Sequence, residues 1–218
     1  MTAKGSHLQT PLNLKYSAKA GSTEVLGPGS RAAIWVHGCC FNCSGCLAES
    51  FKTGPYIEES ADSIADWVLS LNDCCGLTIS GGEPFLQAAA LSEMIRIIRE
   101  RKDLGVIIYT GFTYEELCSE AEDDISVAKL LSVTDILIDG RYVDELNDGV
   151  PYRGSANQRI IRLSDRYMNE MDYYEPEDGK RKMEIRVSPD SLMMIGIPDR
   201  EQLDMWNALK EKGGFIWE

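Results

Sequence analysis

Short apolar runs alternate with helical patterns through most of the chain. Four runs are bounded by turn residues and have the length of buried strands: residues 32–36, 77–79, 106–109 and 136–138. Between them lie amphipathic stripes with apolar residues at i, i+3, i+4 and i+7, one from Ile64 to Leu71 and one from Leu91 to Ile98. This alternation predicts an α/β fold in which helices cover a parallel sheet, either open or curled toward a barrel.

The length of the chain limits how far such a barrel can extend. A chain of 218 residues suits one core, and eight strand–helix repeats do not fit in it. If the sheet curls, we therefore expect no more than a partial barrel, in a core at residues 31–163 that is preceded at 1–30 by an irregular arm with a short strand. Residues 164–218 are expected to form an extension that packs on the core. Its predicted parts are an acidic loop at 171–181, strands at 183–187 and 192–197, and a helix capped by Asp199 and Gln202.

Acidic side chains dominate the charge of this chain. It carries 35 acidic and 22 basic residues, which gives a formal net charge of −13. Such a charge repels phosphate backbones and anionic membrane surfaces, so neither nucleic acid nor a membrane is an expected partner. The sequence has no apolar run of membrane-spanning length and no signal-peptide pattern near its start. We expect a soluble, cytoplasmic protein.

Four of the seven cysteines fall within eight residues, at positions 39, 40, 43 and 46. In a reducing cytoplasm, clustered thiols indicate metal binding more than disulfides. The spacing C-x3-C-x2-C over Cys39, Cys43 and Cys46 lets one loop direct three sulfurs at a common centre. Three ligands would leave one position of an iron–sulfur cluster open, as in catalytic metal sites. An open position predicts chemistry at the cluster.

Two other arrangements of the same cysteines stay open. Cys40, Cys43 and Cys46 form a C-x2-C-x2-C frame like part of a bacterial ferredoxin, although a fourth cysteine followed by proline is missing. A structural zinc site could use the same thiols, but no second C-x2-C pair stands at zinc-finger spacing. The C-x3-C-x2-C frame fits best, and Cys40 is interpreted as a packed thiol.

The segment GPGSRAAIWVHGCCFNCSGC at residues 27–46 resembles the cluster loop of radical S-adenosylmethionine (SAM) activating enzymes, above all the anaerobic ribonucleotide reductase activases. The resemblance implies a [4Fe-4S] cluster on Cys39, Cys43 and Cys46, with SAM bound to the remaining iron. Most radical SAM proteins have an aromatic residue where this chain has Gly45, whereas the reductase activases tend to have glycine. The resemblance also implies that the backbone at Gly45 and Leu47 approaches the adenine, which a missing side chain permits.

A glycine-rich turn follows the second apolar run. Its residues Gly81, Gly82, Glu83 and Pro84 stand at the predicted carboxyl end of that strand, where ligands bind in parallel sheets. Adjacent glycines let the backbone approach a ligand, and Glu83 adds a negative charge for an ammonium group. The plainer interpretation is a strand-to-helix turn in which Glu83 complements the helix N-terminus. The turn resembles the Gly-Gly-Glu-Pro motif with which radical SAM enzymes hold the SAM amino group, which implies cofactor contacts for these four residues.

Polar residues also end the third and fourth runs. Thr110 follows one run, and Asp139 and Arg141 follow the other. The resemblance to glycyl-radical activases implies that these three lie near the SAM ribose and carboxylate, and solvated loop residues are the alternative. The segment RGSANQ at residues 153–158 resembles the R-G-S-x-N-Q segment of the reductase activases. Its residue types favour a tight turn that hydrogen-bonds its own backbone.

The resemblance covers about residues 25–163 and implies a partial (β/α)6-type radical SAM barrel. The implied activity is reductive cleavage of SAM to a 5′-deoxyadenosyl radical, which abstracts hydrogen from a glycyl radical enzyme such as an anaerobic ribonucleotide reductase. The implied electron donor is a flavodoxin or ferredoxin. Because residues 164–218 do not match that family, two alternatives stay open. One is radical SAM modification of a peptide or small molecule, and the other is an iron–sulfur electron-transfer or binding module.

Overall fold

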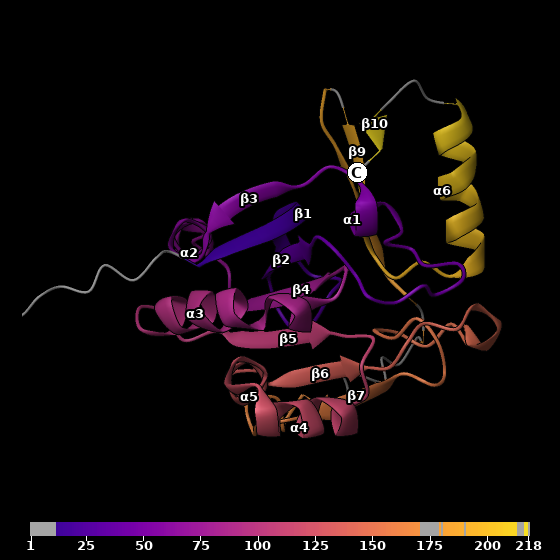
Figure 1. Cartoon of the computed structure of the whole chain (residues 1–218). Coiled ribbons are helices and arrows are strands. Elements are labelled where there is room, and N and C mark those ends of the chain that lie inside the picture. Colours follow the sequence, from indigo (N-terminus) through magenta and orange to yellow (C-terminus); the bar gives the residue numbers. More distant parts are fainter. Residues whose placement is uncertain (1–11, 171–178, 180, 190, 213–215, 218) are drawn as a thin grey trace, which may run out of the picture.

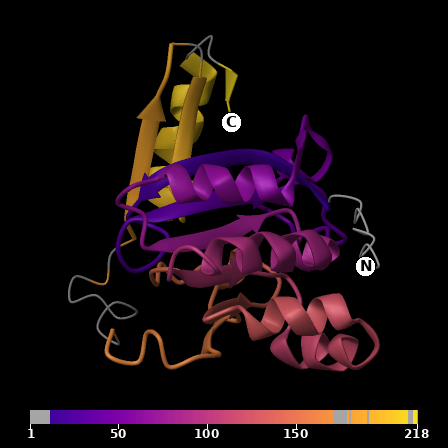
Figure 2. The ribbon, with the colours of Figure 1, turned by 90° about the vertical axis from the view of Figure 1, so that its left-hand side faces the viewer.

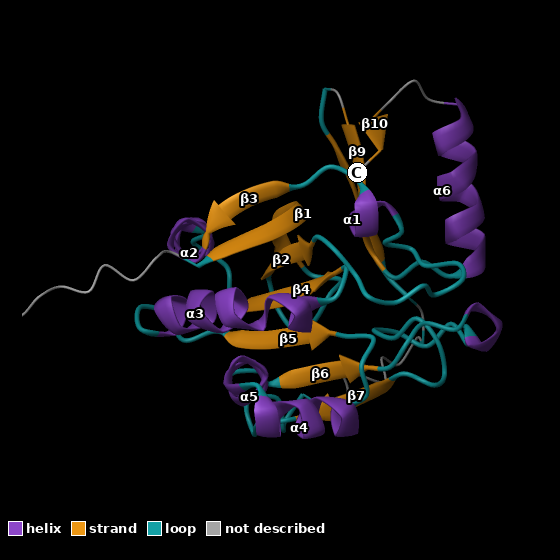
Figure 3. Cartoon of the chain, in the orientation of Figure 1, coloured by secondary structure: helices purple, strands orange, loops and turns teal. Residues whose placement is uncertain are grey.

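The computed structural model describes residues 12–170, 179, 181–189, 191–212 and 216–217. Its main element is a seven-stranded sheet (Figures 1 and 3). In spatial order its strands are β3 (Ile57–Ser60), β1 (Asn13–Thr23), β2 (Arg31–Val36), β4 (Gly76–Gly81), β5 (Gly105–Tyr109), β6 (Ile136–Asp139) and β7 (Arg159–Arg162). The helices between them are α1 (Ser50–Thr53), α2 (Ala61–Ser70), α3 (Ala88–Arg99), α4 (Tyr114–Asp123) and α5 (Ile125–Ser132), with short 3-10 turns η1 (Pro84–Gln87) and η2 (Asp144–Leu146).

The centre of the sheet is parallel, which confirms the predicted α/β fold. Strands β2, β4, β5 and β6 pair with one another in that order, all in parallel. Strands β1, β3 and β7 pair antiparallel at the flanks. Among the described strands, β3 and β7 are the two edges and do not pair with each other. Because the central strands are parallel, their carboxyl ends lie along one side of the sheet, and the loops after them share that side.

Alternation along the strands divides the apolar residues between two faces. Helices α2, α3 and α5 cover one face (Figure 2), and the buried residues of the parallel strands on that side are Ala32, Ile34, Val36, Leu77, Ile79, Val106, Ile108 and Leu137. On the opposite face, Ile107, Ile136 and Ile138 pack with Tyr167. The strands at the centre are therefore buried on both sides, as their nearly continuous apolar runs predict.

Helix starts follow local sequence signals. The Thr113 hydroxyl accepts the N–H of Glu116 while the Glu116 carboxylate accepts the N–H of Thr113, so the capping box predicted there is confirmed at the start of α4. Ser60 caps α2 in a simpler way, by accepting the N–H of Ser63. Within the described ranges, no helix combines the length and the apolar composition that a membrane crossing requires.

Strand β1 corrects the expected irregular arm at residues 1–30. It runs for 11 residues and lies inside the sheet, between β3 and β2. Its buried positions are Leu14, Tyr16, Ala18 and Ala20, and more exposed polar residues alternate with them. Because two of these four positions are alanine, the apolar alternation is weak in the sequence, and only pairing with β2 and β3 reveals the strand. Residues 1–11 lie outside the described residues.

Residues beyond the sheet form a small second layer. Strand β8 (Met183–Val187) pairs antiparallel with β9 (Ser191–Gly196), β10 (Ile216–Trp217) pairs parallel with β9, and α6 (Arg200–Lys212) follows β9. These elements confirm the two strands and the last helix predicted there (Figure 1). Asp199 and Gln202 exchange hydrogen bonds of 2.8 and 3.0 Å at the start of α6, as predicted. The acidic loop predicted at 171–181 lies mostly outside the described residues.

Candidate cofactor site

A cavity of about 160 Å³ lies at the carboxyl ends of the parallel strands. Its walls come from the loop after β2, the turns after β4 and β5, the loop after β6 and the segment that follows β9. The predicted site residues that line it are Cys39, Cys43, Cys46, Leu47, Gly81, Gly82, Glu83 and Thr110. Strand ends that are far apart in the sequence therefore meet at one place, as expected for a parallel sheet.

Three thiols face this cavity from the loop after β2. Cys39, Cys43 and Cys46 are free and partly buried, whereas Cys40 is exposed and is not among the lining residues. Burial raises the pKa of the Cys39 and Cys46 thiols, so a thiolate at these positions needs a nearby positive charge. A bound metal centre supplies such a charge and holds the thiols deprotonated.

The arrangement of the thiols suits an iron–sulfur cluster. In the part of the chain that the structure describes, no three His, Cys, Asp or Glu side chains converge as the ligands of one metal ion do. In a [4Fe-4S] cluster each thiolate binds a different iron, so three sulfurs distributed around one cavity fit this group. Cys39, Cys43 and Cys46 are the residues that would hold it.

Gly81 and Gly82 place the turn after β4 directly against the chain that leads into the cysteine loop. An added Cβ would lie 2.5 Å from the Val36 backbone at Gly81, and 2.0 Å from the Gly38 carbonyl oxygen at Gly82. Gly81 also has a φ of 105°, which side chains rarely tolerate. The N–H groups of Gly82 and Glu83 donate to the carbonyls of Val36 and Gly38, each at 2.8 Å. The two glycines therefore join the turn to the start of the thiol loop.

Glu83 braces the cavity from a fully buried position. Its carboxylate accepts hydrogen bonds from the Phe85 N–H at 3.0 Å, the Thr110 hydroxyl at 2.9 Å and the Gly111 N–H at 2.8 Å. Burial outweighs these bonds and raises the pKa of Glu83 to about 7. The bond to Phe85 is the helix-start role that the plainer interpretation expects. The bonds to Thr110 and Gly111 connect the ends of β4 and β5.

Asp139 and Pro84 are predicted contacts that do not line the cavity. The Asp139 carboxylate accepts the Tyr114 N–H at 2.7 Å and the Arg159 Nε–H at 3.0 Å, so it serves the start of α4 and the neighbouring strand β7. Pro84 is buried at the first position of η1, where its ring shapes the turn. Neither residue contacts the cavity, but each stabilises a turn that does.

Arg141 and Gly45 also do not line the cavity. Gly45 is part of the loop that carries the thiols, and Arg141 contacts this loop. The Arg141 guanidinium lies 4.5 Å from the centre of the Phe41 ring, in a cation–π contact. Phe41 lies between the first two ligand positions and meets the Phe112 ring edge-on at 4.8 Å. Gly45 has a φ of 71°, and an added Cβ there would come within 3.3 Å of Asp144. Arg141 and Gly45 therefore shape the loop that carries the thiols.

The RGSANQ segment forms the tight turn that its residue types predict. The Gln158 side-chain oxygen accepts the N–H groups of Gly154 and Ser155 at 2.7 and 3.2 Å, and its amide donates to the Gly140 carbonyl at 2.8 Å. The turn therefore also anchors the loop after β6. Gly154 and Gln158 line the cavity, a role that the sequence did not suggest.

The sequence analysis also missed other lining residues, among them Phe41, Lys52, Tyr142 and Ile197. Phe41 stands within the cysteine motif, which is a local signal for it. Lys52 is bonded to Glu49 at 2.7 Å with its side chain only 9% exposed, and its place in α1 gives no such signal. Tyr142 and Ile197 come from distant loops, so only the folded chain brings them to the thiols.

Comparison with known proteins supports the same centre. Residues 25–161 match the family model described as a 4Fe-4S single cluster domain. The chain is 35% identical over 153 residues to the anaerobic ribonucleoside-triphosphate reductase-activating protein of Vibrio cholerae, covering 64% of this chain and 92% of that protein. It is 28% identical to the Escherichia coli K12 protein of the same name, with the same coverage. A pyruvate formate-lyase-activating enzyme of Listeria monocytogenes is 30% identical over 122 residues, 52% of this chain and 47% of that enzyme.

The matched region contains every cysteine and every strand end that surrounds the cavity, apart from the segment around Ile197. The region that matches the family is therefore the region that builds most of the cavity. The chain belongs to the 4Fe-4S single cluster domain family and, within it, to the anaerobic ribonucleoside-triphosphate reductase-activating proteins.

Proposed function

We propose that this protein is a radical SAM enzyme that activates a glycyl radical enzyme, with an anaerobic ribonucleotide reductase as the preferred partner. The names of its relatives support activation of this kind. When bound, a [4Fe-4S] cluster supplies one electron to SAM, and cleavage yields methionine and a 5′-deoxyadenosyl radical that takes hydrogen from a glycine. A flavodoxin or ferredoxin is the proposed electron donor.

The proposed cofactor contacts follow from the walls of the cavity. Gly81 and Gly82 expose backbone where a side chain would block approach, so we assign the SAM amino group to this turn. Glu83 lies beneath it, where its oxygens already accept three protein hydrogen bonds, and burial raises its pKa to about 7, so it adds a full negative charge only above that pH. Leu47 offers an apolar surface beside Cys46 for the adenine. Thr110 reaches the cavity as the remaining polar contact.

A single observation carries the proposal. The three thiols of C-x3-C-x2-C and the Gly-Gly-Glu turn line one cavity, and the turn is hydrogen-bonded to the residues just before the first thiol. An electron-transfer module needs bound thiolates alone, whereas this arrangement adds a place for a second, charged ligand next to them. That difference favours enzyme chemistry over electron transfer.

The fold supports a macromolecular substrate. The sheet has a parallel centre and open edges, and we assign it to the partial (β/α)6 type, with residues 31–163 as the core and 164–218 as the extension. A face that is not closed by further repeats leaves room for a protein partner to reach the cavity. We place the protein in the cytoplasm, where such partners occur.

The test begins with anaerobic reconstitution of the protein with iron and sulfide, followed by reduction and incubation with SAM. We expect 5′-deoxyadenosine, and its absence would sink the enzyme proposal. Replacing Cys39 with serine should abolish the cluster's absorbance and the product. Cys40→Ser is the matched control and should retain both, because Cys40 does not line the cavity. Loss in Cys40→Ser with retention in Cys39→Ser would instead indicate the ferredoxin-like frame.

The second candidate is radical SAM modification of a peptide or small molecule. It is favoured by Ile197, because this residue lies outside the matched family region and still lines the cavity. Incubation of the reduced enzyme and SAM with the anaerobic reductase from the same genome separates the two candidates. A glycyl radical signal in electron paramagnetic resonance (EPR) supports activation, and 5′-deoxyadenosine without that signal supports the second candidate.

A further inference from the structure

The segment that follows β9 reaches the cofactor site from outside the matched family region. The family match ends at residue 161, yet Ile197 lines the same cavity as Cys39 and Glu83. Ile197 is held there because β9 is fixed on the sheet: Ile195 is fully buried with Ala20, Leu26 and Ala33. The end of β9 is therefore part of the cavity wall.

A second attachment fixes the other strand of this hairpin. The Glu184 carboxylate on β8 accepts the Thr23 hydroxyl at 3.0 Å and the Glu24 N–H at 2.8 Å. Both donors lie at the end of β1, on the central sheet. The hairpin is thus attached by polar and apolar contacts, and Ile197 cannot leave the wall without breaking them.

Arg181 is the third attachment, and it is a buried charge. Its side chain is only 1% exposed and comes from the residues just before β8. Its guanidinium donates to three backbone carbonyls of the loop after β6, namely those of Val150 at 3.0 Å, Arg153 at 2.7 Å and Gly154 at 3.2 Å. It also donates to the Pro198 carbonyl at 2.9 Å, next to Ile197. One side chain therefore ties together two walls of the cavity.

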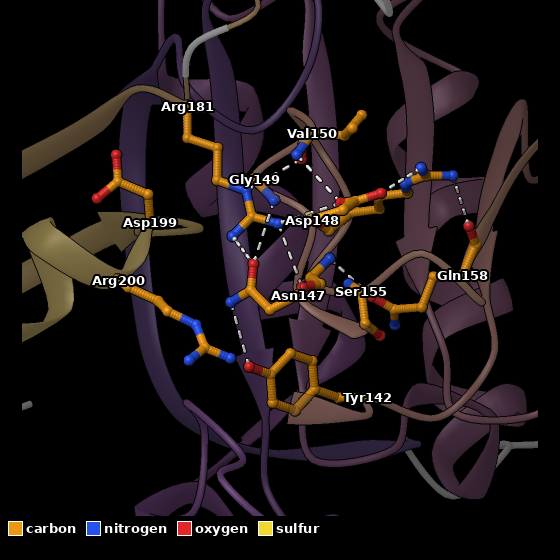
Figure 4. A network of polar contacts seen from close by, with 12 residues as sticks. Tyr142, Asn147, Asp148, Gly149, Val150, Ser155, Gln158, Arg181, Asp199 and Arg200 are labelled. Carbon is orange, nitrogen blue, oxygen red and sulfur yellow. Dashed lines mark hydrogen bonds and ion pairs between the residues drawn. The ribbon is translucent and has the colours of Figure 1, made fainter. Parts of the chain in front are cut away.

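A short polar chain leads from Arg181 to a lining residue (Figure 4). Arg181 donates to the Asn147 side-chain oxygen at 2.8 Å, and the Asn147 amide donates to the Tyr142 hydroxyl at 3.3 Å. The Tyr142 hydroxyl donates in turn to Asp144 at 2.7 Å. The Tyr142 ring lines the cavity, and it lies so close to Gly154 that a Cβ there would come within 2.8 Å. Arg181 therefore holds the Tyr142 hydroxyl in place through Asn147, and the ring through Gly154.

We infer that the chain beyond the family core forms a substrate-facing wall of the site, with Ile197 as a specificity-determining residue and Arg181 as a positioning residue for Tyr142. The inference rests on the proposed function, since it concerns which substrate reaches the cofactor. Ile197 gives this wall an aliphatic surface, and Tyr142 adds an aromatic one from the neighbouring loop after β6. Such a wall suits an uncharged stretch of polypeptide that carries the target glycine, more than a small ionic substrate.

Enlarging Ile197 tests the wall directly. With Ile197→Trp, we expect the concentration of anaerobic reductase needed for half-maximal EPR glycyl radical formation to rise about tenfold, because the added ring fills the path of the substrate. Formation of 5′-deoxyadenosine without partner is measured for the same variant, and the glycyl radical is expressed per 5′-deoxyadenosine formed, so that an effect on SAM is separated from an effect on the reductase. The matched control is Val187→Trp, at a position of the same hairpin that is 74% exposed. Equal behaviour of the two variants and the wild type would overturn the role of Ile197.

The positioning role of Arg181 can be measured on the metal-free protein. We expect Arg181→Met to shift the NMR signal of the Tyr142 ring carbon bonded to the hydroxyl, identified by its absence in Tyr142→Phe. Arg181→Lys should restore the charge but not the signal, because lysine cannot reproduce the planar set of donors. Arg186→Met is the matched control, since Arg186 pairs with Glu184 inside the hairpin. An unchanged Tyr142 signal in folded Arg181→Met, or the same shift in Arg186→Met, would refute the assignment.

The two proposals fail in different ways. A wild-type protein that makes no 5′-deoxyadenosine refutes the enzyme proposal, while the Tyr142 signal of the metal-free protein still reports on Arg181. A wild-type protein that forms the glycyl radical, with Ile197→Trp unaffected, refutes only the substrate-facing wall.

Discussion

Two buried arginines have similar surroundings but lie at opposite ends of the parallel strands. Arg31 is fully buried at the amino end of β2, and it donates to the Thr78 and Tyr167 hydroxyls and to the carbonyls of Pro28, Leu77 and Gly105. Arg181 is 4% exposed and donates to carbonyls and an amide at the carboxyl ends, beside the cavity. Each guanidinium has five N–H donors in one plane, and with them it joins chain segments that are distant in sequence.

The difference between them lies in what they join. Arg31 connects the amino ends of β2, β4 and β5, where no lining residue of the cavity is found. An added Cβ at Gly76 would lie 2.1 Å from its Nη1 atom, so the neighbouring strand is built around this side chain. Arg181 instead connects loops whose residues line the cavity. A buried arginine thus stabilises the fold at the amino ends of the strands, and another fixes the shape of the cavity at their carboxyl ends.

Arg31→Met should give the largest loss of stability. It removes the only charged donor group among five buried acceptors, and we expect the free energy of unfolding to fall by about 3 to 5 kcal/mol. Urea unfolding of the metal-free protein measures this. The folded fraction should still bind a cluster after reconstitution. A decrease of less than about 1 kcal/mol in the free energy of unfolding would show that the acceptors find other donors. Arg31 would then not have the stabilising role that separates it from Arg181.

Glu83→Gln should change how stability depends on pH. Burial raises the pKa of Glu83 from 4.5 to about 7, so between these values the folded protein holds a proton that the unfolded chain has lost. The stabilising effect of that proton is complete below pH 4.5 and is lost as the pH rises through about 7. We expect wild-type stability relative to the glutamine variant to fall by about 2 to 3 kcal/mol between pH 5 and pH 8.

Urea unfolding of both metal-free proteins at several pH values measures this difference. Parallel pH profiles for wild type and Glu83→Gln would mean that the carboxyl is ionised throughout, with its three donors outweighing burial. The result shows whether Glu83, at the carboxyl ends of the strands, is charged or neutral in the folded protein. Arg31, at the amino ends, keeps its charge and is surrounded by neutral acceptors.

Arg101→Met should have the smallest effect. Arg101 pairs with Asp66 at 2.9 Å, but the two side chains are 60% and 68% exposed. Exposed pairs contribute little because water screens the attraction, so we expect a change of at most about 0.5 kcal/mol in the free energy of unfolding. The same urea measurement provides the result, and high salt should reduce the difference further because it screens the pair. If Arg101→Met lowered the free energy of unfolding nearly as much as Arg31→Met, burial would not explain why Arg31 contributes more to stability.

Much of the core and of the site could be predicted from local patterns. Four buried strands, the capping box at Thr113 and the last helix are confirmed because each depends on residues close together in the chain. The thiol spacing and the Gly-Gly-Glu turn predicted one site because parallel strands bring their ends together. Asp139 and Arg141 were harder to place, since a position at a strand end does not say whether a side chain turns toward the cavity or toward a neighbour such as Arg159 or Phe41.

The sequence by itself determined the alternating sheet and the thiol and glycine motifs that line the cavity, because their signals are spacings that hold in any α/β fold. The tertiary structure alone decided which buried arginine lies beside the cavity and that Ile197 and Tyr142 line it. These contacts join residues that are far apart in the chain, and no local pattern marks a carbonyl that will meet a guanidinium. Packing of the C-terminal strands on β1 brings those groups within bonding distance.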